Sequence, residues 1–180
     1  MRVAIDAREL CGRPTGVGRY LAALLDAWAA SDRARRHEWV LIAHAPLAEA
    51  ARWPAQSVIV KGAGGSIWEQ LSLPRALSAQ RPDVVFSPGY TAPVTVATPL
   101  VLTVHDVSFF ARPEWFSFRE GTRRRLLTAW SARRARTVEM LHQWDRELPR
   151  RAERLANGAD RRAGTPGRAD DVEGSVDERA

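Results

Sequence analysis

The chain has 180 residues, of which 45% are hydrophobic and 27% are charged, a size and composition typical of one folded domain. These values exclude disorder over the whole length, and no apolar stretch is long enough for a membrane-spanning helix. The single cysteine, Cys11, cannot form an internal disulfide, and the start at Met1–Asp6 meets charge too early for a signal peptide. We therefore expect a cytoplasmic protein. The net charge is +6, and arginine supplies nearly all of the positive charge, because Lys61 is the only lysine.

Residues 1–138 alternate short β-branched runs with helical periods, which is the pattern of βαβ units around a parallel sheet. Arg2–Asp6 predicts the first strand. The next apolar residues recur at helical spacing and predict one stripe of an amphipathic helix, formed by Val17, Tyr20, Leu21, Leu24, Leu25 and Trp28. Strands are predicted next at Trp39–Ala43 and Ser57–Val60, with a short helix at Leu47–Arg52 between them.

The second half of this region begins with a capping-box pattern, in which Ser66 would cap a helix and Glu69 would reach back to it. Pro74 would force a kink or a restart in that helix. Strands are then predicted at Asp83–Phe86 and Leu100–Val104. The fold class is therefore α/β, with a Rossmann-like parallel sheet and helices on both of its faces.

A basic helix is predicted to follow the last strand, from about Phe116 to Val138. Its outer faces are rich in arginine, at positions Arg123, Arg124, Arg125, Arg133, Arg134 and Arg136. Such a face is usually solvated, although it can also rest on anionic lipid or on a nucleic-acid backbone.

The pattern of alternating strands and helices fails after Val138. Glu139–Ala156 has helical spacing that Pro149 interrupts, and 157–180 is rich in Gly, Pro, Arg and Asp, which is typical of disorder. We therefore divide the chain into a domain at 1–138 and a tail at 139–180 that is partly helical and then disordered.

Ligands of open parallel sheets bind outside the carboxyl ends of the strands, so the loops after the strand ends are the candidate sites. The first of these loops carries Gly16 and Gly18 just before a helix, where glycine lets the backbone approach an anion that the helix amides face. The loop lacks the Gly-Lys-Ser/Thr of a phosphate loop, and Leu21 stands where a dinucleotide fingerprint has Gly or Ala. A tight turn without any ligand explains the glycines about equally well.

The second candidate site is His105 with Asp106, at the end of the last predicted strand. A histidine in this position can bind a sugar hydroxyl or carry a proton, while Asp106 would orient the loop. A buried histidine with a purely structural role is an equal alternative. A metal site and a serine hydrolase are not indicated, because one Cys and four scattered His lack zinc spacing and no Gly-x-Ser-x-Gly occurs.

Four stretches, in their order and spacing, resemble the N-terminal domain of family 4 glycosyltransferases, which are retaining enzymes with a GT-B fold. They are Ile5–Arg8 with Gly16–Tyr20, Trp68–Gln70, Pro82–Pro88, and Thr103–Phe109 continued by Pro113–Phe116. The resemblance implies transfer of a hexose from GDP-mannose or a UDP-sugar, with retention and without a bound metal or other cofactor. The acceptor, a glycan or a lipid-linked molecule, would bind this domain.

The resemblance also implies roles for individual residues. Gly16 and Gly18 would approach the donor phosphates, and His105 would contact the transferred sugar as the catalytic residue. Arg19, Tyr90 and Asp106 would belong to the acceptor side.

Residues 139–180 depart from the family, in which a second Rossmann-like domain with a Glu-x7-Glu motif holds the donor. The chain is therefore expected to be a truncated or frameshifted product, either inactive or an acceptor-binding module. The basic helix would allow peripheral contact with the inner face of a membrane. Nucleic acid is not an expected partner, because basic and aromatic residues do not interleave on a strand.

Overall fold

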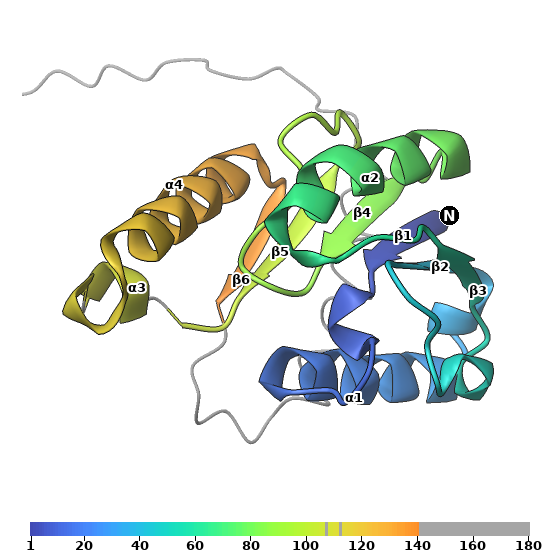
Figure 1. Cartoon of the computed structure of the whole chain (residues 1–180). Helices are drawn as coiled ribbons and strands as arrows, with labels where there is room; N and C mark the ends of the chain where they lie inside the picture. The colour runs from blue at the N-terminus through green and yellow to red at the C-terminus, as the bar shows by residue number, and fades with distance from the viewer. Residues whose placement is uncertain (107, 112, 141–180) are drawn as a thin grey trace, which may run out of the picture.

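Aliphatic and β-branched runs form six parallel strands of one sheet, in the order β3-β2-β1-β4-β5-β6 (Figure 1). The computed structural model describes residues 1–106, 108–111 and 113–140. The strands are β1 (Arg2–Asp6), β2 (Glu38–Ala43), β3 (Gln56–Ile59), β4 (Val84–Ser87), β5 (Leu100–Val104) and β6 (Thr137–Met140).

Helices cover both faces of this sheet (Figure 1). The α-helices are α1 (Gly16–Ala30), α2 (Gly65–Gln80), α3 (Ser108–Ala111) and α4 (Phe118–Arg134). The 3₁₀ turns are η1 (Arg8–Leu10), η2 (Ala34–Arg36), η3 (Ala50–Arg52) and η4 (Pro113–Trp115). Helix α1 packs on one face, and α2 and α4 lie on the other.

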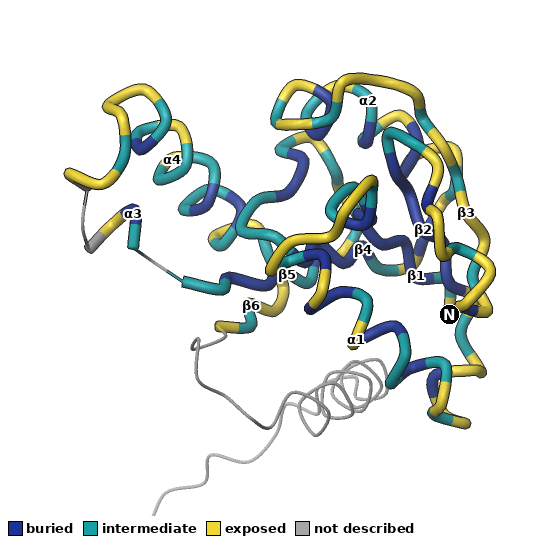
Figure 2. Tube along the Cα trace, turned by 60° about the horizontal axis from the view of Figure 1, so that its bottom comes forward, coloured by how far each residue is buried: buried dark blue, intermediate teal, exposed yellow. Residues whose placement is uncertain are grey.

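The core consists of two layers because side chains of a strand point alternately to the two faces of the sheet. In β1, Val3 and Ile5 join the cluster under α1, whereas Ala4 joins the cluster under α2. Figure 2 shows the central strands buried along their length. Trp28 of α1 stacks on Trp39 of β2, with ring centroids 4.6 Å apart. This packing fixes α1 with its first turn at the carboxyl edge of the sheet.

The predicted fold class is confirmed, and β1 and β5 have the predicted bounds. The predicted capping box is wrong. Helix α2 begins at Gly65 with Gly64 as its N-cap, and within the described ranges no side chain caps it. Glu69 instead turns its carboxylate to Arg8. The helix also continues through Pro74 to Gln80 without a restart. The short helix predicted before β3 is the 3₁₀ turn η3.

The predicted helix from Phe116 to Val138 ends early, at Arg134. Ala135 is extended, and the amide of Arg136 donates to the carbonyl of Leu100 at 2.8 Å. The chain then enters β6, which pairs with β5 and crosses the boundary predicted at Val138. Glu139 and Met140 are therefore strand residues and not helical ones. The remainder of the predicted tail lies outside the described residues.

Candidate functional site

The order in which the chain adds strands to the sheet reverses between β1 and β4, which are parallel neighbours. From β1 the chain runs outward to β2 and β3, and from β4 it runs the other way to β5 and β6. Loops at such a switch point diverge and leave a crevice at the carboxyl edge. The loops after β1, β4 and β5 all lie at this edge, because the three strands are parallel neighbours.

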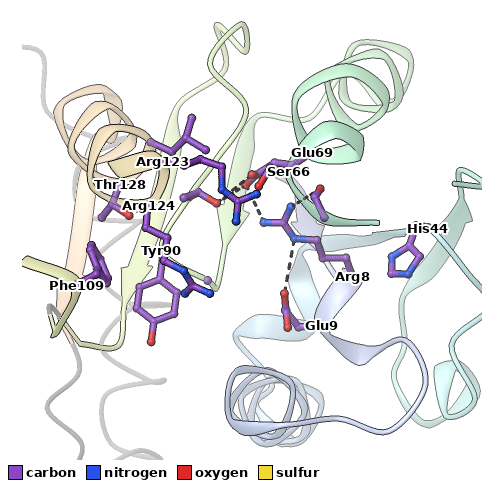
Figure 3. Close-up of a pocket in the computed structure, with 14 residues that line it drawn as sticks. Arg8, Glu9, His44, Ser66, Glu69, Tyr90, Phe109, Arg123, Arg124 and Thr128 are labelled. Carbon is purple, nitrogen blue, oxygen red and sulfur yellow. Dashed lines mark hydrogen bonds and ion pairs between the residues drawn. The ribbon is translucent and has the colours of Figure 1, made fainter. Parts of the chain in front are cut away.

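A pocket of about 390 Å³ opens at this edge, between η1, the first turn of α2, the β4–β5 loop, α3 and α4 (Figure 3). Its lining is Arg8, Glu9, His44, Gly65, Ser66, Glu69, Gly89, Tyr90, Thr91, Phe109, Arg123, Arg124, Leu127 and Thr128. Of the six predicted site residues, Tyr90 belongs to this lining in the described part of the chain.

Arg8 is the centre of a buried ion-pair network in this pocket. Its Nη2 lies 2.7 Å from Oε1 of Glu69, and its Nε lies 3.3 Å from Oδ2 of Asp6. Thr91 donates its hydroxyl to the same Glu69 carboxylate at 2.7 Å. The side chains of Asp6 and Glu69 are almost fully buried, and that of Arg8 is 10% exposed. The network therefore connects the end of β1 to α2 and to the β4–β5 loop.

Burial in this network disfavours the ionised form of the Asp6 carboxyl group. Burial raises the pKa of Asp6 to about 6, and the nearby Glu69 adds to that rise, although Arg8 acts against it. One guanidinium thus faces two buried carboxylates, and a buried charge without a full partner is costly. Asp6 accordingly takes up a proton at a higher pH than an exposed aspartate.

His105 lies beside the pocket with its ring held by two tyrosines and a carbonyl group. Its Nε2 lies 2.6 Å from the oxygen of Pro88, and a carbonyl oxygen can only accept, so Nε2 carries the proton in our assignment. Tyr20 and Tyr90 place their rings 4.9 and 5.5 Å from the imidazole. Burial lowers the pKa of His105, more than the Pro88 bond and Asp106 raise it. The ring is therefore neutral at pH 7, with Nδ1 as an acceptor.

Tyr90 and Asp106 hold the loops around His105 in place. Tyr90 has a φ of 58°, in the left-handed region, and its hydroxyl donates to Oδ2 of Asp106 at 2.8 Å. Oδ1 of Asp106 accepts from the amide and the hydroxyl of Ser108, at 2.9 and 2.6 Å. Partial burial opposes ionisation of Asp106, but these hydrogen bonds outweigh it and lower its pKa. Asp106 is thus placed as an orienting carboxylate.

Gly16 and Gly18 lie in the first turn of α1 and not in the loop before it, and one of them is closely packed while the other is open. A Cβ on Gly18 would collide with the carbonyl oxygen of Glu9 and would lie 2.9 Å from Cβ of Pro14. A Cβ on Gly16 would meet no atom of the described chain within 4 Å. The Gly18 position therefore needs glycine for packing alone, whereas Gly16 leaves open space before α1. Arg19 is exposed on the first turn of α1.

The structure thus brings Tyr90, His105 and Asp106 into one cluster, and it adds residues that sequence reasoning did not select. Arg8 and Glu69 fell within the stretches that carry the resemblance, but no pattern in the sequence pairs them. Of the pocket residues of α4, the sequence analysis named Arg123 and Arg124, as parts of the basic face.

The strand order and the helices on both faces define an α/β protein with a doubly wound, Rossmann-like parallel sheet. No known protein family, curated protein or solved structure matches this chain. Among the described residues, no helix is both long and apolar enough to cross a membrane.

Proposed function

We propose that this chain is the acceptor-binding domain of an enzyme that transfers a hexose from a nucleotide-sugar with retention. The observation that supports this proposal best is the neutral imidazole of His105 at the switch point of the sheet, between two tyrosine rings. Its Nδ1 can accept a hydrogen bond from a sugar hydroxyl, which fits the role that the resemblance gives to this position.

The proposed reaction uses three parts of the carboxyl edge. The donor phosphates approach the open space at Gly16, where the first amides of α1 favour an anion. His105 orients the hexose, and the acceptor lies in the pocket between α2 and α4. The bond from the anomeric carbon to the phosphate oxygen breaks and a bond to the acceptor oxygen forms on the same face. The acceptor's hydroxyl proton goes to the nucleoside diphosphate that leaves.

A second candidate function is an acceptor-binding module that does not turn over a donor. The specific observation in its favour is that the pocket is built within residues 8–128, whereas donor binding in the resembled family depends mainly on another domain. Both candidates use the same pocket, and they differ in whether the chain binds and consumes a nucleotide-sugar.

A donor titration separates these two candidates. The full chain is titrated with UDP-glucose and with GDP-mannose by calorimetry, and release of UDP or GDP is followed with and without glycan acceptors. We expect donor binding that His105→Ala weakens by about tenfold, the effect of losing a positioned hydrogen bond in a closed site.

The control variant is His37→Ala, because His37 directly precedes β2 and so lies at the opposite edge of the sheet. An equal loss in both variants would contradict a role for His105. Absence of donor binding and turnover in the folded wild-type chain would reject the enzyme and leave the acceptor-binding module.

A further inference from the structure

The pocket has two walls that the proposed roles of His105 and the glycine loop leave unexplained. One wall is the first turn of α2. Gly64 and Gly65 both have φ near +70°, and no described side chain caps the helix, so its first amides lack a side-chain acceptor. Gly65 and Ser66 line the pocket beside Arg8. A helix N-terminus with open amides favours an anion, but this wall alone does not define a site.

The opposite wall comes from α4 and contains an unpaired buried hydroxyl. Thr128 is 4% exposed, and its Oγ1 has no hydrogen-bond partner among the described residues. In Figure 3 its oxygen points toward the interior of the pocket. Leaving a buried hydroxyl unpaired costs the hydrogen bond that it would make with water, so folded proteins rarely tolerate one without a reason. A ligand oxygen in the pocket would supply the missing partner.

Arginines of α4 add positive charge to the same wall. The guanidinium of Arg123 has no ion pair or hydrogen bond within the described residues, and Figure 3 shows it reaching into the pocket between the two walls. Arg124 also lines the pocket but shares its charge with Glu120, at 2.8 Å. Arg123 is therefore the cation that is available to a ligand.

The acidic residues of the pocket do not cancel this charge. Glu69 is committed to Arg8 and Thr91, and the carboxylate of Glu9, which is 39% exposed, lies 3.8 Å from Arg8. Donors thus converge on one space from the α2 amides, the Thr128 hydroxyl and the Arg123 guanidinium. Such a set matches the several oxygens of a tetrahedral phosphate better than the two oxygens of a planar carboxylate.

We propose that the pocket between the first turn of α2 and α4 binds a phosphate group carried by the acceptor. This proposal rests on the proposed function, because it names the chemical class of the acceptor. A pocket of about 390 Å³ holds a phosphate together with part of the molecule that carries it. The acceptor is then a phosphorylated sugar or a molecule with a phospholipid-like head group, and both present the same chemistry to the pocket.

The test measures binding of phosphates to the full chain by calorimetry, without any donor. The probes are inorganic phosphate, glucose 6-phosphate with glucose as its neutral counterpart, and dihexanoyl phosphatidylglycerol below its micellar concentration. We expect inorganic phosphate to bind and glucose 6-phosphate to bind far better than glucose. The stronger of the two organic probes identifies a soluble or a lipid source of the phosphate.

Two pairs of variants locate the binding on α4. Arg123→Gln and Thr128→Val should each weaken phosphate binding by about tenfold, the effect of one hydrogen bond to a charged group. Arg133→Gln and Thr122→Val change the same residue types on the same helix outside the pocket, and they should leave the affinity unchanged. Thr128→Val should also raise the melting temperature of the free chain, because it removes an unpaired hydroxyl.

Failure of this proposal is distinguishable from failure of the proposed function. Absence of phosphate binding, or an equal loss in the control variants, overturns the phosphate site even where the donor titration succeeds. A lower melting temperature of Thr128→Val would show that the hydroxyl has a partner and would remove the main support. Phosphate binding with the expected variant pattern, in a chain that binds no donor, upholds the site and rejects hexose transfer.

Discussion

Arg8 holds three segments together at the pocket. They are the end of β1, helix α2 and the β4–β5 loop. The Arg8 guanidinium lies between the carboxylates of Asp6 and Glu69, and Glu69 in turn receives the hydroxyl of Thr91. Removing one partner of a buried ion pair costs more than replacing both partners by apolar residues, because the remaining charge is left without compensation. In this network the cation is the partner whose removal leaves two buried carboxylates.

The substitution Arg8→Met is therefore expected to destabilise the fold by about 3–5 kcal/mol at pH 7.5. The cost should be smaller at pH 5, because protonation of Asp6, whose pKa burial raises, removes one of the two uncompensated charges. Urea unfolding followed by tryptophan fluorescence measures both values. Arg75→Met on α2 is the control, because Arg75 is exposed and outside the network. A cost that is equal at the two pH values would contradict this electrostatic role of Arg8.

The elements of the sheet differ in how well the sequence predicts them. The central strands are buried on both faces, so they appear as apolar runs, and β5 was predicted to the residue. Strand β6 was missed because it is a four-residue edge strand in which Thr137, Val138 and Met140 are exposed. With one side unpaired and no alternation of apolar and polar residues, it could not be distinguished from an extension of α4.

The candidate site was predictable only in part, for a similar reason. The strand-end rule located His105 and the glycine loop, because it requires only the order of strands and helices. The pairing of Arg8 with Glu69 joins positions 61 residues apart and depends on how α2 is rotated about its axis. The unpaired hydroxyl of Thr128 depends on side-chain packing of α4, which no periodicity in the sequence specifies.

Exposed chain lies at the end of the molecule formed by α3 and the start of α4 (Figure 2), and several of the residues in this region are aromatic. Phe110, Trp115 and Phe118 are all exposed, with Phe118 the most open at 83%. Arg119 lies beside them on α4 and is exposed as well. Aromatic and basic residues together are typical of surfaces that bind anionic membranes, so this surface is where the predicted peripheral contact can be tested.

This surface predicts binding to vesicles that contain phosphatidylglycerol and weaker binding to vesicles of phosphatidylcholine alone. Replacing Trp115 and Phe118 by serine should reduce co-sedimentation by about tenfold or more, because each ring buries apolar area in the interface. The control replaces Ile67 and Leu71 of α2, which are also exposed. Equal binding to both vesicle types, or an equal loss in the control, would reject the membrane contact.

The stability of the whole molecule should depend on pH through Asp6. The pKa of this carboxyl is about 6 in the folded chain, compared with its usual value of 3.8, and burial is the main cause. The folded state then holds the proton more tightly than the unfolded state. The contribution of Asp6 is fully present below about pH 4 and is lost as pH rises through 6, by about 3 kcal/mol in total. Asp106, with its lowered pKa, contributes in the opposite direction.

The variant Asp6→Asn isolates this contribution because it cannot ionise. The free energy of unfolding is measured in urea at pH 4, 5, 6 and 7 for the wild type and for the variant. The value for the wild type minus that for the variant should fall by about 2.5 kcal/mol over this range. Asp32→Asn is the exposed control, since the Asp32 side chain is 96% exposed, and it should not reproduce this fall. A difference that rises with pH would mean that attraction to Arg8 outweighs burial, so that the folded state holds the Asp6 proton less tightly than the unfolded state.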